Sequence, residues 1–306
     1  MAVAGTAAAT EMAHEFFFGG SLNFESDINT DPVFIEFKTK EEDMRIEGLA
    51  DYTLDIELSE NDSAGVLASL AMNMFFEENS FSNNMLRVGG YYKRDNMGPL
   101  TFYVDAYLAK YMYAGDVEMD EFMNSSAPVK VDMNSDHLSI NPTLFWRMSD
   151  VHTGVIRAKI RTMTYSDDLD FLDGLDWGLG YKHIWQIDPK MRGGAGLSLN
   201  QANLDEGEWS YSGYRLDIDF SFQIDKMWRV YAAAAFGNKN FDDDFPGEGD
   251  PRKESYMYLA GGVEADLGTV GKAFVGLAST TYTSNVDYFD VNRMVVSGGY
   301  MYTLNF

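Results

Sequence analysis

The chain has 306 residues, a net charge of −25 and no cysteine. So acidic a chain repels the phosphates of nucleic acid, and without cysteine it has neither a disulfide framework nor thiolate chemistry. No window holds the roughly 18 uncharged apolar residues that a transmembrane helix requires. The composition is uniform from one end of the chain to the other, which indicates one domain.

The first residues are small and apolar, and Ala7-Ala8-Ala9 fits a signal-peptidase cleavage site. We therefore interpret 1–13 as the remnant of a secretory signal or a disordered N-terminus. The rest of the chain, 14–306, is predicted to form a single β-domain.

Apolar and polar residues alternate along most of this domain, as in strands with unlike faces. In 214–224, for example, Leu216 and Ile218 share one face, while Arg215 and Asp217 share the other. The pattern predicts 14 strands, most of them long enough to cross a membrane when tilted. They cover about 15–24, 45–58, 65–76, 83–93, 100–113, 137–148, 154–165, 175–186, 191–200, 209–224, 228–238, 255–266, 272–283 and 291–306.

The connections alternate between short turns rich in Asn, Asp, Gly and Pro and longer acidic segments such as 25–44, 114–136, 166–174 and 239–254. The segments on the long-loop side hold 30 acidic and 6 basic residues, which accounts for −24 of the net charge of −25. This asymmetry is typical of a transmembrane barrel with short periplasmic turns and longer extracellular loops. An even strand count would leave both termini in the periplasm.

The C-terminus supplies a further signal. Alternate residues are apolar or aromatic up to the last one, at Tyr300, Tyr302, Leu304 and Phe306. Here the chain resembles the Gram-negative bacterial outer-membrane β-barrel family, whose last strand ends in this way. The resemblance implies a closed antiparallel up-and-down barrel, integral to the cell outer membrane. It also implies that the barrel-assembly machinery reads this strand, and that lipid and lipopolysaccharide surround it.

Rings near the strand ends are expected to form two aromatic girdles at the membrane surfaces. They are Phe24, Phe75, Phe76, Tyr91, Tyr92, Tyr111, Tyr113, Trp146, Trp185, Trp209, Tyr211, Trp228, Tyr300 and Tyr302. A high frequency of aromatics in strands is the simpler explanation.

Charged residues at the alternate positions are expected to face the interior. The predicted pore-lining residues are Arg87, Arg147, Arg157, Lys159, Arg161, Lys182, Arg215, Arg229 and Arg293, with Asp51, Asp55, Asp105, Asp217 and Asp219. Partial separation of the two signs would set a transverse field across a wet lumen. A barrel of about 14 strands is wider than one that side chains can fill. We therefore expect a porin-like channel for small hydrophilic solutes or ions, with a lumen plugged by ion pairs as the alternative.

Several other functions are alternatives to a porin-like channel. A structural, adhesive or secretion barrel without an open pore fits the same pattern. A fatty-acid transporter would need an N-terminal plug, for which the residues before the first strand leave no room. The four histidines suggest no catalytic site, so no enzyme is expected. The acidic runs 167–170 and 242–244 lack the spacing of a calcium loop, so neither metal nor cofactor is expected. A soluble β-sandwich would need neither the loop asymmetry nor the terminal phenylalanine.

The charges also predict selectivity. Acidic loops at the outer mouth should concentrate cations, and the basic residues of 157–161 favour anions inside. Because salt screens exposed charges beyond about 8 Å at physiological ionic strength, we expect a weak cation preference that fades as salt rises.

Overall fold

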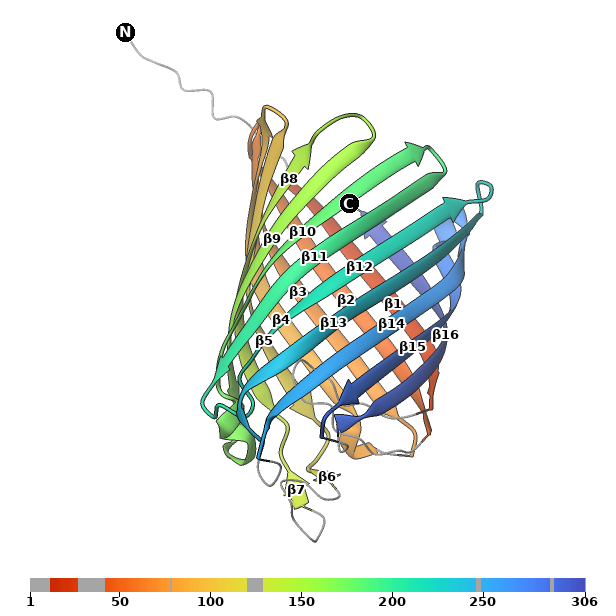
Figure 1. The fold of residues 1–306 in the computed structure, drawn as a ribbon. Helices are drawn as coiled ribbons and strands as arrows, with labels where there is room; N and C mark the ends of the chain where they lie inside the picture. Colours follow the sequence, from red (N-terminus) through yellow and green to blue (C-terminus); the bar gives the residue numbers. More distant parts are fainter. Residues whose placement is uncertain are drawn as a thin grey trace.

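The computed structural model describes residues 12–26, 42–77, 79–119, 129–245, 249–286 and 289–305. Fourteen strands form one closed barrel (Figure 1). In barrel order they are β1 (Met12–Glu25), β2 (Asp43–Ser59), β3 (Asp62–Phe75), β4 (Asn83–Met97), β5 (Leu100–Tyr113), β8 (Ser135–Arg147), β9 (His152–Tyr165), β10 (Gly174–Asp188), β11 (Met191–Leu204), β12 (Tyr211–Gln223), β13 (Trp228–Asp244), β14 (Pro251–Asp266), β15 (Lys272–Ser284) and β16 (Val291–Asn305).

Each barrel strand pairs antiparallel with the barrel strands before and after it, β5 pairs with β8, and β1 pairs with β16 to close the sheet. The predicted count and order of strands are confirmed. The largest difference is in β13, which continues six residues beyond the predicted end at 238. Its polar residues look like loop in the sequence, but Lys239 stays in register with Glu254 of β14 and lies 3.8 Å from its carboxylate.

The two ends of the barrel differ, as the sequence predicts. The short turns lie at the upper end in Figure 1, where β1 begins and β16 ends, and the longer connections lie at the lower end. We call these the turn end and the loop end. Between β4 and β5 the backbone reverses at Gly98, whose φ of 67° favours glycine. Of the expected signal remnant 1–13, residues 1–11 lie outside the described residues, whereas Met12 and Ala13 belong to β1. Much of the loops at 25–44 and 114–136 also lies outside the described residues.

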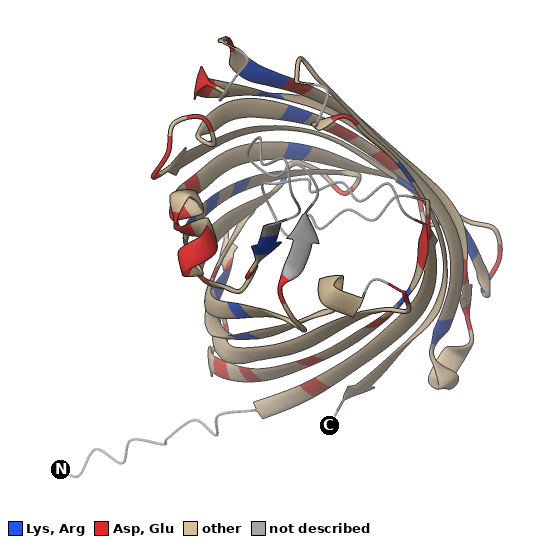
Figure 2. Ribbon diagram, turned by 90° about the horizontal axis from the view of Figure 1, so that it is seen from below, with Lys and Arg blue, Asp and Glu red and all other residues tan. Residues whose placement is uncertain are grey.

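The long connection between β5 and β8 contains a small two-stranded sheet that the alternation did not predict. Its strands are β6 (Val117–Met119) and β7 (Val129–Val131). In the described part of the chain there are also three short 3-10 helices: η1 (Asn79–Phe81), η3 (Asp167–Leu172) and η4 (Gly268–Val270). Viewed from the loop end, the acidic η3 sits on the rim of the barrel (Figure 2). No helix in the described ranges is long and apolar enough to cross a membrane.

The outer surface of the barrel is apolar because every second residue of each strand faces outward. Ile156, Ile160, Leu216 and Ile218, predicted to meet lipid, are 39%, 48%, 46% and 54% exposed. In a barrel surrounded by water such a surface would be strongly unfavourable, whereas lipid requires it. Tyr300, Tyr302 and Leu304 of the C-terminal motif occupy outward positions of β16, and Phe306 lies outside the described residues.

The best-packed apolar residues lie at the loop end, inside the mouth. They come from strand ends and loops around the barrel: Phe75, Phe81, Val131, Met133, Met163, Leu169, Phe171, Leu172, Ala202, Leu204, Trp209, Tyr211, Phe241, Val286 and Phe289. We call this set the mouth cluster. The girdle prediction is therefore wrong for Phe75, Trp209 and Tyr211. A ring near a strand end can face either way, and only the register decides which.

Candidate functional site: the barrel interior

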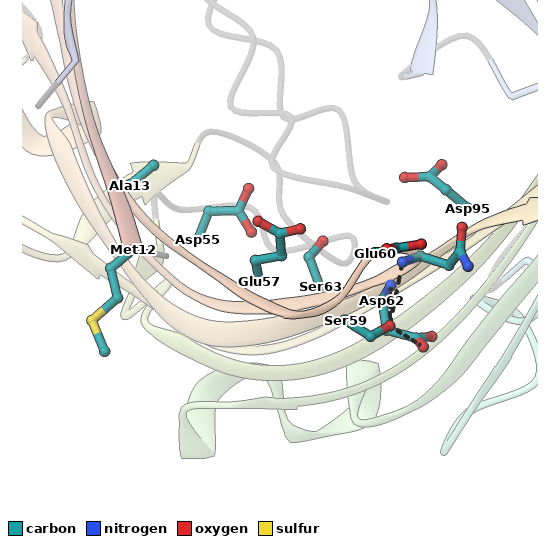
Figure 3. A pocket seen from close by; sticks show the side chains of 10 residues that line it. Met12, Ala13, Asp55, Glu57, Ser59, Glu60, Asp62, Ser63 and Asp95 are labelled. Atoms are coloured by element: carbon teal, nitrogen blue, oxygen red, sulfur yellow. Dashed lines mark hydrogen bonds between the residues drawn. The ribbon is translucent and has the colours of Figure 1, made fainter. Parts of the chain in front are cut away.

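Side chains at the turn end show which face of the sheet is the inner one. Figure 3 shows Asp55, Glu57 and Ser63 pointing into the space that the strands enclose, while Met12 points away from it. They line a pocket of about 300 Å³. Glu57 of β2 is in register with Ser63 of β3, as expected for residues that share a face. Period-two alternation and the registers then fix the inward residues of every other strand.

By this rule all of the predicted interior residues occupy inward positions, and Arg147 differs from the others in lying at the end of its strand. Arg147 is the last residue of β8, where its side chain is 70% exposed and lies 2.7 Å from Asp150 across the following turn. Its side chain therefore lies at the rim of the turn end. The charge pattern could not show this, because the final residue of a strand has no wall beyond it.

The inward faces of β1 and β2 carry mainly carboxylates. These are Glu15, Glu25, Asp43, Glu47, Asp51, Asp55 and Glu57, and Arg45 is the only basic residue among them in the described part of these strands. We call them the acidic sector. Near the loop end Arg45 lies 2.8 Å from Glu25 and 2.5 Å from Glu47. Further along β2, Asp51 lies 3.9 Å from Arg87 of β4.

The inward faces of β9 to β12 carry most of the cations. We call Arg157, Lys159, Arg161, Lys182, Arg192 and Arg215 the basic sector. Arg192 is not among the predicted residues, since the small residues that follow it show no alternation.

Part of the basic sector is neutralised locally. Asp176 of β10 is buried and forms ion pairs with both Lys159 and Arg161 of β9. Lys182 forms ion pairs with Asp217, at 3.3 Å, and with Asp219. The basic sector thus keeps a net positive charge, because the inward faces of β9 to β12 carry six cations and only three carboxylates.

Closure of the barrel places the two sectors opposite each other. Along the strand order, β1 is seven strands from β10 and β2 is seven strands from β11, which is half of the 14-stranded circle. The carboxylates of one wall therefore face the cations of the other. The sequence shows the two sets but not this opposition, because strand order becomes an angle only when the sheet closes.

Tyrosines occupy the two remaining sides of the interior. One track consists of Tyr91 on β4 with Tyr103, Tyr107, Tyr111 and Tyr113 on β5. The other consists of Tyr231 on β13, Tyr256 and Tyr258 on β14, and Tyr282 on β15. These rings are half-buried. Since β4 lies seven strands from β13, the tracks also face each other. The girdle prediction is thus also wrong for Tyr91, Tyr111 and Tyr113, which face inward.

Neighbouring cations and rings hold these tyrosines in place. The rings of Tyr91 and Tyr103 stack with centroids 5.6 Å apart, and those of Tyr256 and Tyr282 stack at 5.3 Å. The guanidinium of Arg87 lies 5.1 Å from the ring centre of Tyr107. A glycine lies beneath some of these rings: a Cβ atom at Gly65 would come within 2.4 Å of the Tyr91 ring. The rings thus lie flat against the wall.

The remaining predicted residues pair with nearby side chains. Asp105 accepts a hydrogen bond from the side-chain amide of Asn141, at 2.8 Å. Arg229 lies 2.7 Å from Glu264, and Arg293 lies 2.8 Å from Glu25. These contacts link adjacent strands of the wall.

The histidines lie in separate places. His14 contacts the Tyr52 hydroxyl at 3.0 Å, and His137 is buried between the rings of Tyr111 and Tyr165. His152 and His183, from neighbouring strands, approach each other to 3.0 Å on the outer face at the turn end. Within the described ranges, no three His, Asp or Glu side chains converge as a metal site.

The mouth cluster is a feature that sequence reasoning missed. At one side of it the guanidinium carbon of Arg252 lies 3.7 Å from the ring centre of Phe241 and 3.8 Å from that of Phe289. Arg252 is 1% exposed and lies 3.1 Å from the Glu254 carboxylate. The concentration of Phe and Trp in otherwise acidic loops is the signal that could have indicated it.

No protein-family model and no curated protein matches the sequence. Solved structures do match. The toluene transporter TodX of Pseudomonas putida is 9% identical with a TM-score of 0.53, covering 94% of this chain and 89% of that one. A deltaS2 mutant of TodX, described as a monoaromatic hydrocarbon channel, is 9% identical with a TM-score of 0.54, covering 98% and 91%. The chain shares the closed antiparallel β-barrel fold of these outer-membrane channels. At such low identity the likeness of this chain to TodX concerns the fold.

Proposed function

We propose that this outer-membrane barrel is a passive channel for small hydrophilic solutes or ions, integral to the outer membrane of a Gram-negative bacterium, and not an enzyme. The observation that carries the proposal is the distribution of charge. Inward positions of the strands hold most of the charged side chains, and outward positions hold the large apolar ones. A protein that only spans the membrane has no need of charged residues on opposite interior walls, since each buried charge costs free energy.

The apolar outer surface and the C-terminal motif support the rest of the proposal. The motif fits recognition by the barrel-assembly machinery, and the outer surface fits contact with lipid and lipopolysaccharide. TodX is named for the transport of a hydrocarbon, and the mouth cluster of this chain is also apolar. Its side chains are packed against one another, however, and the interior beyond them is charged. These features favour hydrophilic over hydrocarbon cargo.

Single-channel conductance of the refolded chain in a planar bilayer tests the proposal. We expect sustained ohmic current. Silence at all voltages would favour a structural or adhesive barrel whose interior is plugged by ion pairs.

Because the chain has no cysteine, single cysteines can prove that the current passes through the interior. A charged thiol reagent should reduce the current of Asp51→Cys, at an inward position. The matched control is Leu216→Cys, which faces lipid and should not respond. Equal block of both variants would count against a pore inside the barrel.

A further inference from the structure

The charges that no neighbour neutralises are distributed unevenly around the interior. In the acidic sector, Glu15, Asp55 and Glu57 form no ion pair with any described residue. In the basic sector the same is true of Arg157, Arg192 and Arg215. Unpaired carboxylates are thus concentrated on one wall, and unpaired guanidiniums on the wall facing it.

Some of these unpaired groups have tyrosines of the adjacent tracks beside them. The hydroxyl of Tyr91 lies near the Asp55 carboxylate, and that of Tyr256 lies near the Arg215 guanidinium. A neutral hydroxyl beside a charge does not cancel it. The opposition of the two walls is therefore preserved and not relaxed by local pairing.

Opposed charges on facing walls create a field across the lumen, and the effect on a solute depends on its charge distribution. An uncharged solute gains little from such a field. A simple anion or cation is attracted to one wall and repelled by the other. A zwitterion aligns its ammonium group with the acidic wall and its carboxylate with the basic wall, so both of its charges are stabilised.

The acidic loops add a second basis for selection among solutes. Their surplus of carboxylates repels anions at the mouth but exerts no net force on a solute of zero net charge. Inside, the two tyrosine tracks offer half-buried rings to the side chains of a solute whose charged ends point at the other two walls.

We propose that the channel favours zwitterionic solutes of the amino-acid and short-peptide class over uncharged and singly charged solutes of the same size. This inference rests on the proposed channel function and specifies its substrate class. The groups that carry it are Asp55 and Glu57 on one wall, and Arg157 and Arg215 on the other.

A liposome-swelling assay with the refolded full chain tests the proposal. Four solutes share nearly one size and differ in charge: glycylglycine, N-acetylglycinamide, N-acetylglycine and glycylglycinamide. They are, respectively, a zwitterion, an uncharged molecule, an anion and a cation. We expect glycylglycine to enter at least about threefold faster than N-acetylglycinamide, and faster than both ions.

Double variants then show which residues cause the preference for glycylglycine. Asp55→Asn with Glu57→Gln removes two of the three unpaired carboxylates of the acidic wall, and Arg157→Gln with Arg215→Gln removes two of the three unpaired guanidiniums of the basic wall. Each pair should bring the ratio of glycylglycine to N-acetylglycinamide close to one. The control, Arg147→Gln with Asp150→Asn, neutralises two charges at the exposed rim and should keep the ratio. Heat-modifiable gel mobility verifies that each variant forms a closed barrel.

The outcomes distinguish failure of the zwitterion preference from failure of the channel function. If all four solutes enter at equal rates, the zwitterion preference is wrong and the channel function stands. If N-acetylglycine enters fastest, the basic sector alone governs entry and the inference is overturned. If no solute enters, the channel function itself fails, and the inference fails with it.

Discussion

Glu25 and Arg293 are 268 positions apart in the sequence, yet the Glu25 carboxylate lies 2.8 Å from the Arg293 guanidinium. The same carboxylate lies 2.8 Å from Arg45 of β2, and its side chain is fully buried. Glu25 therefore connects the first strand to both of its neighbours, at the seam where the barrel closes.

Removing this carboxylate should weaken the seam. Glu25→Gln leaves two guanidiniums without their shared partner, and loss of one member of a buried pair costs about 3 kcal/mol. We expect a lower urea midpoint for unfolding, followed by heat-modifiable gel mobility. Glu47→Gln is the control, since Glu47 also pairs with Arg45 but is 40% exposed. An equal effect of both variants would contradict a special role of the seam.

Arg252 should hold the loop end together. Its guanidinium lies between the rings of Phe241 and Phe289 and pairs with Glu254. Arg252→Ala removes the centre of this arrangement and leaves a buried carboxylate, so we expect faster proteolysis of the loops with little change in the unfolding of the strands. Arg252→Lys retains the charge but not the flat group that stacks on rings, and should be intermediate. Exposed Lys253→Ala should behave like the unaltered chain; a similar loss there would disprove the assignment.

Trp185 and Gly193 form a matched pair on the outer face. They are directly opposite each other in β10 and β11, and a Cβ atom at position 193 would lie 2.4 Å from the indole nitrogen. Gly193→Ala should displace the ring and destabilise the barrel by about 1–3 kcal/mol, with a shift in tryptophan fluorescence. Adding Trp185→Ala should recover part of the lost stability. If the double variant shows the sum of the two single losses, the two residues do not interact.

Mild acid should stabilise the loops near η3. Burial, together with the charges of Asp205 and Asp170, raises the pKa of Asp173, and burial and Glu208 raise the pKa of Glu206. For an acid whose pKa is higher in the folded state, stability is greatest at low pH and is lost as pH rises through the folded pKa. Hydrogen exchange of 166–174 should therefore slow as pH falls from neutral towards the ordinary pKa of a carboxyl group, after correction for the intrinsic rate.

A substitution can isolate the Asp173 contribution. Asp173→Asn should slow exchange at neutral pH and reduce its pH dependence, because the side-chain oxygen can still accept the Tyr165 N–H at 2.6 Å. Asp225→Asn is the control at the turn end, where the backbone N–H groups of Trp228 and Met227 lower the pKa of Asp225. It should leave exchange in 166–174 unchanged. Unaltered exchange in Asp173→Asn would contradict the explanation.

Ion selectivity tests the balance between mouth and interior. With most of the net negative charge in the loops, we expect a weak cation preference at low salt that fades as salt rises, because the mouth charges are exposed and screened. Reversal potentials under a salt gradient measure it. Clear anion selectivity at low salt would show that the basic sector, not the mouth, controls ion passage.

The sequence by itself determined the number of strands, their order, the faces of residues such as Ile218 and Asp219, and the asymmetry between turns and loops. It could do so because lipid requires an apolar outer face and internally paired backbone, which forces period-two alternation on every spanning strand. Only the tertiary structure decided what depends on closure and on contacts between distant segments. It sets the acidic wall opposite the basic one, leaves Arg147 at the rim, and gathers Phe241, Arg252 and Phe289 into the mouth. Alternation specifies a face but neither an angle around the barrel nor a partner across a loop, and these follow from register and from the burial of apolar rings away from water.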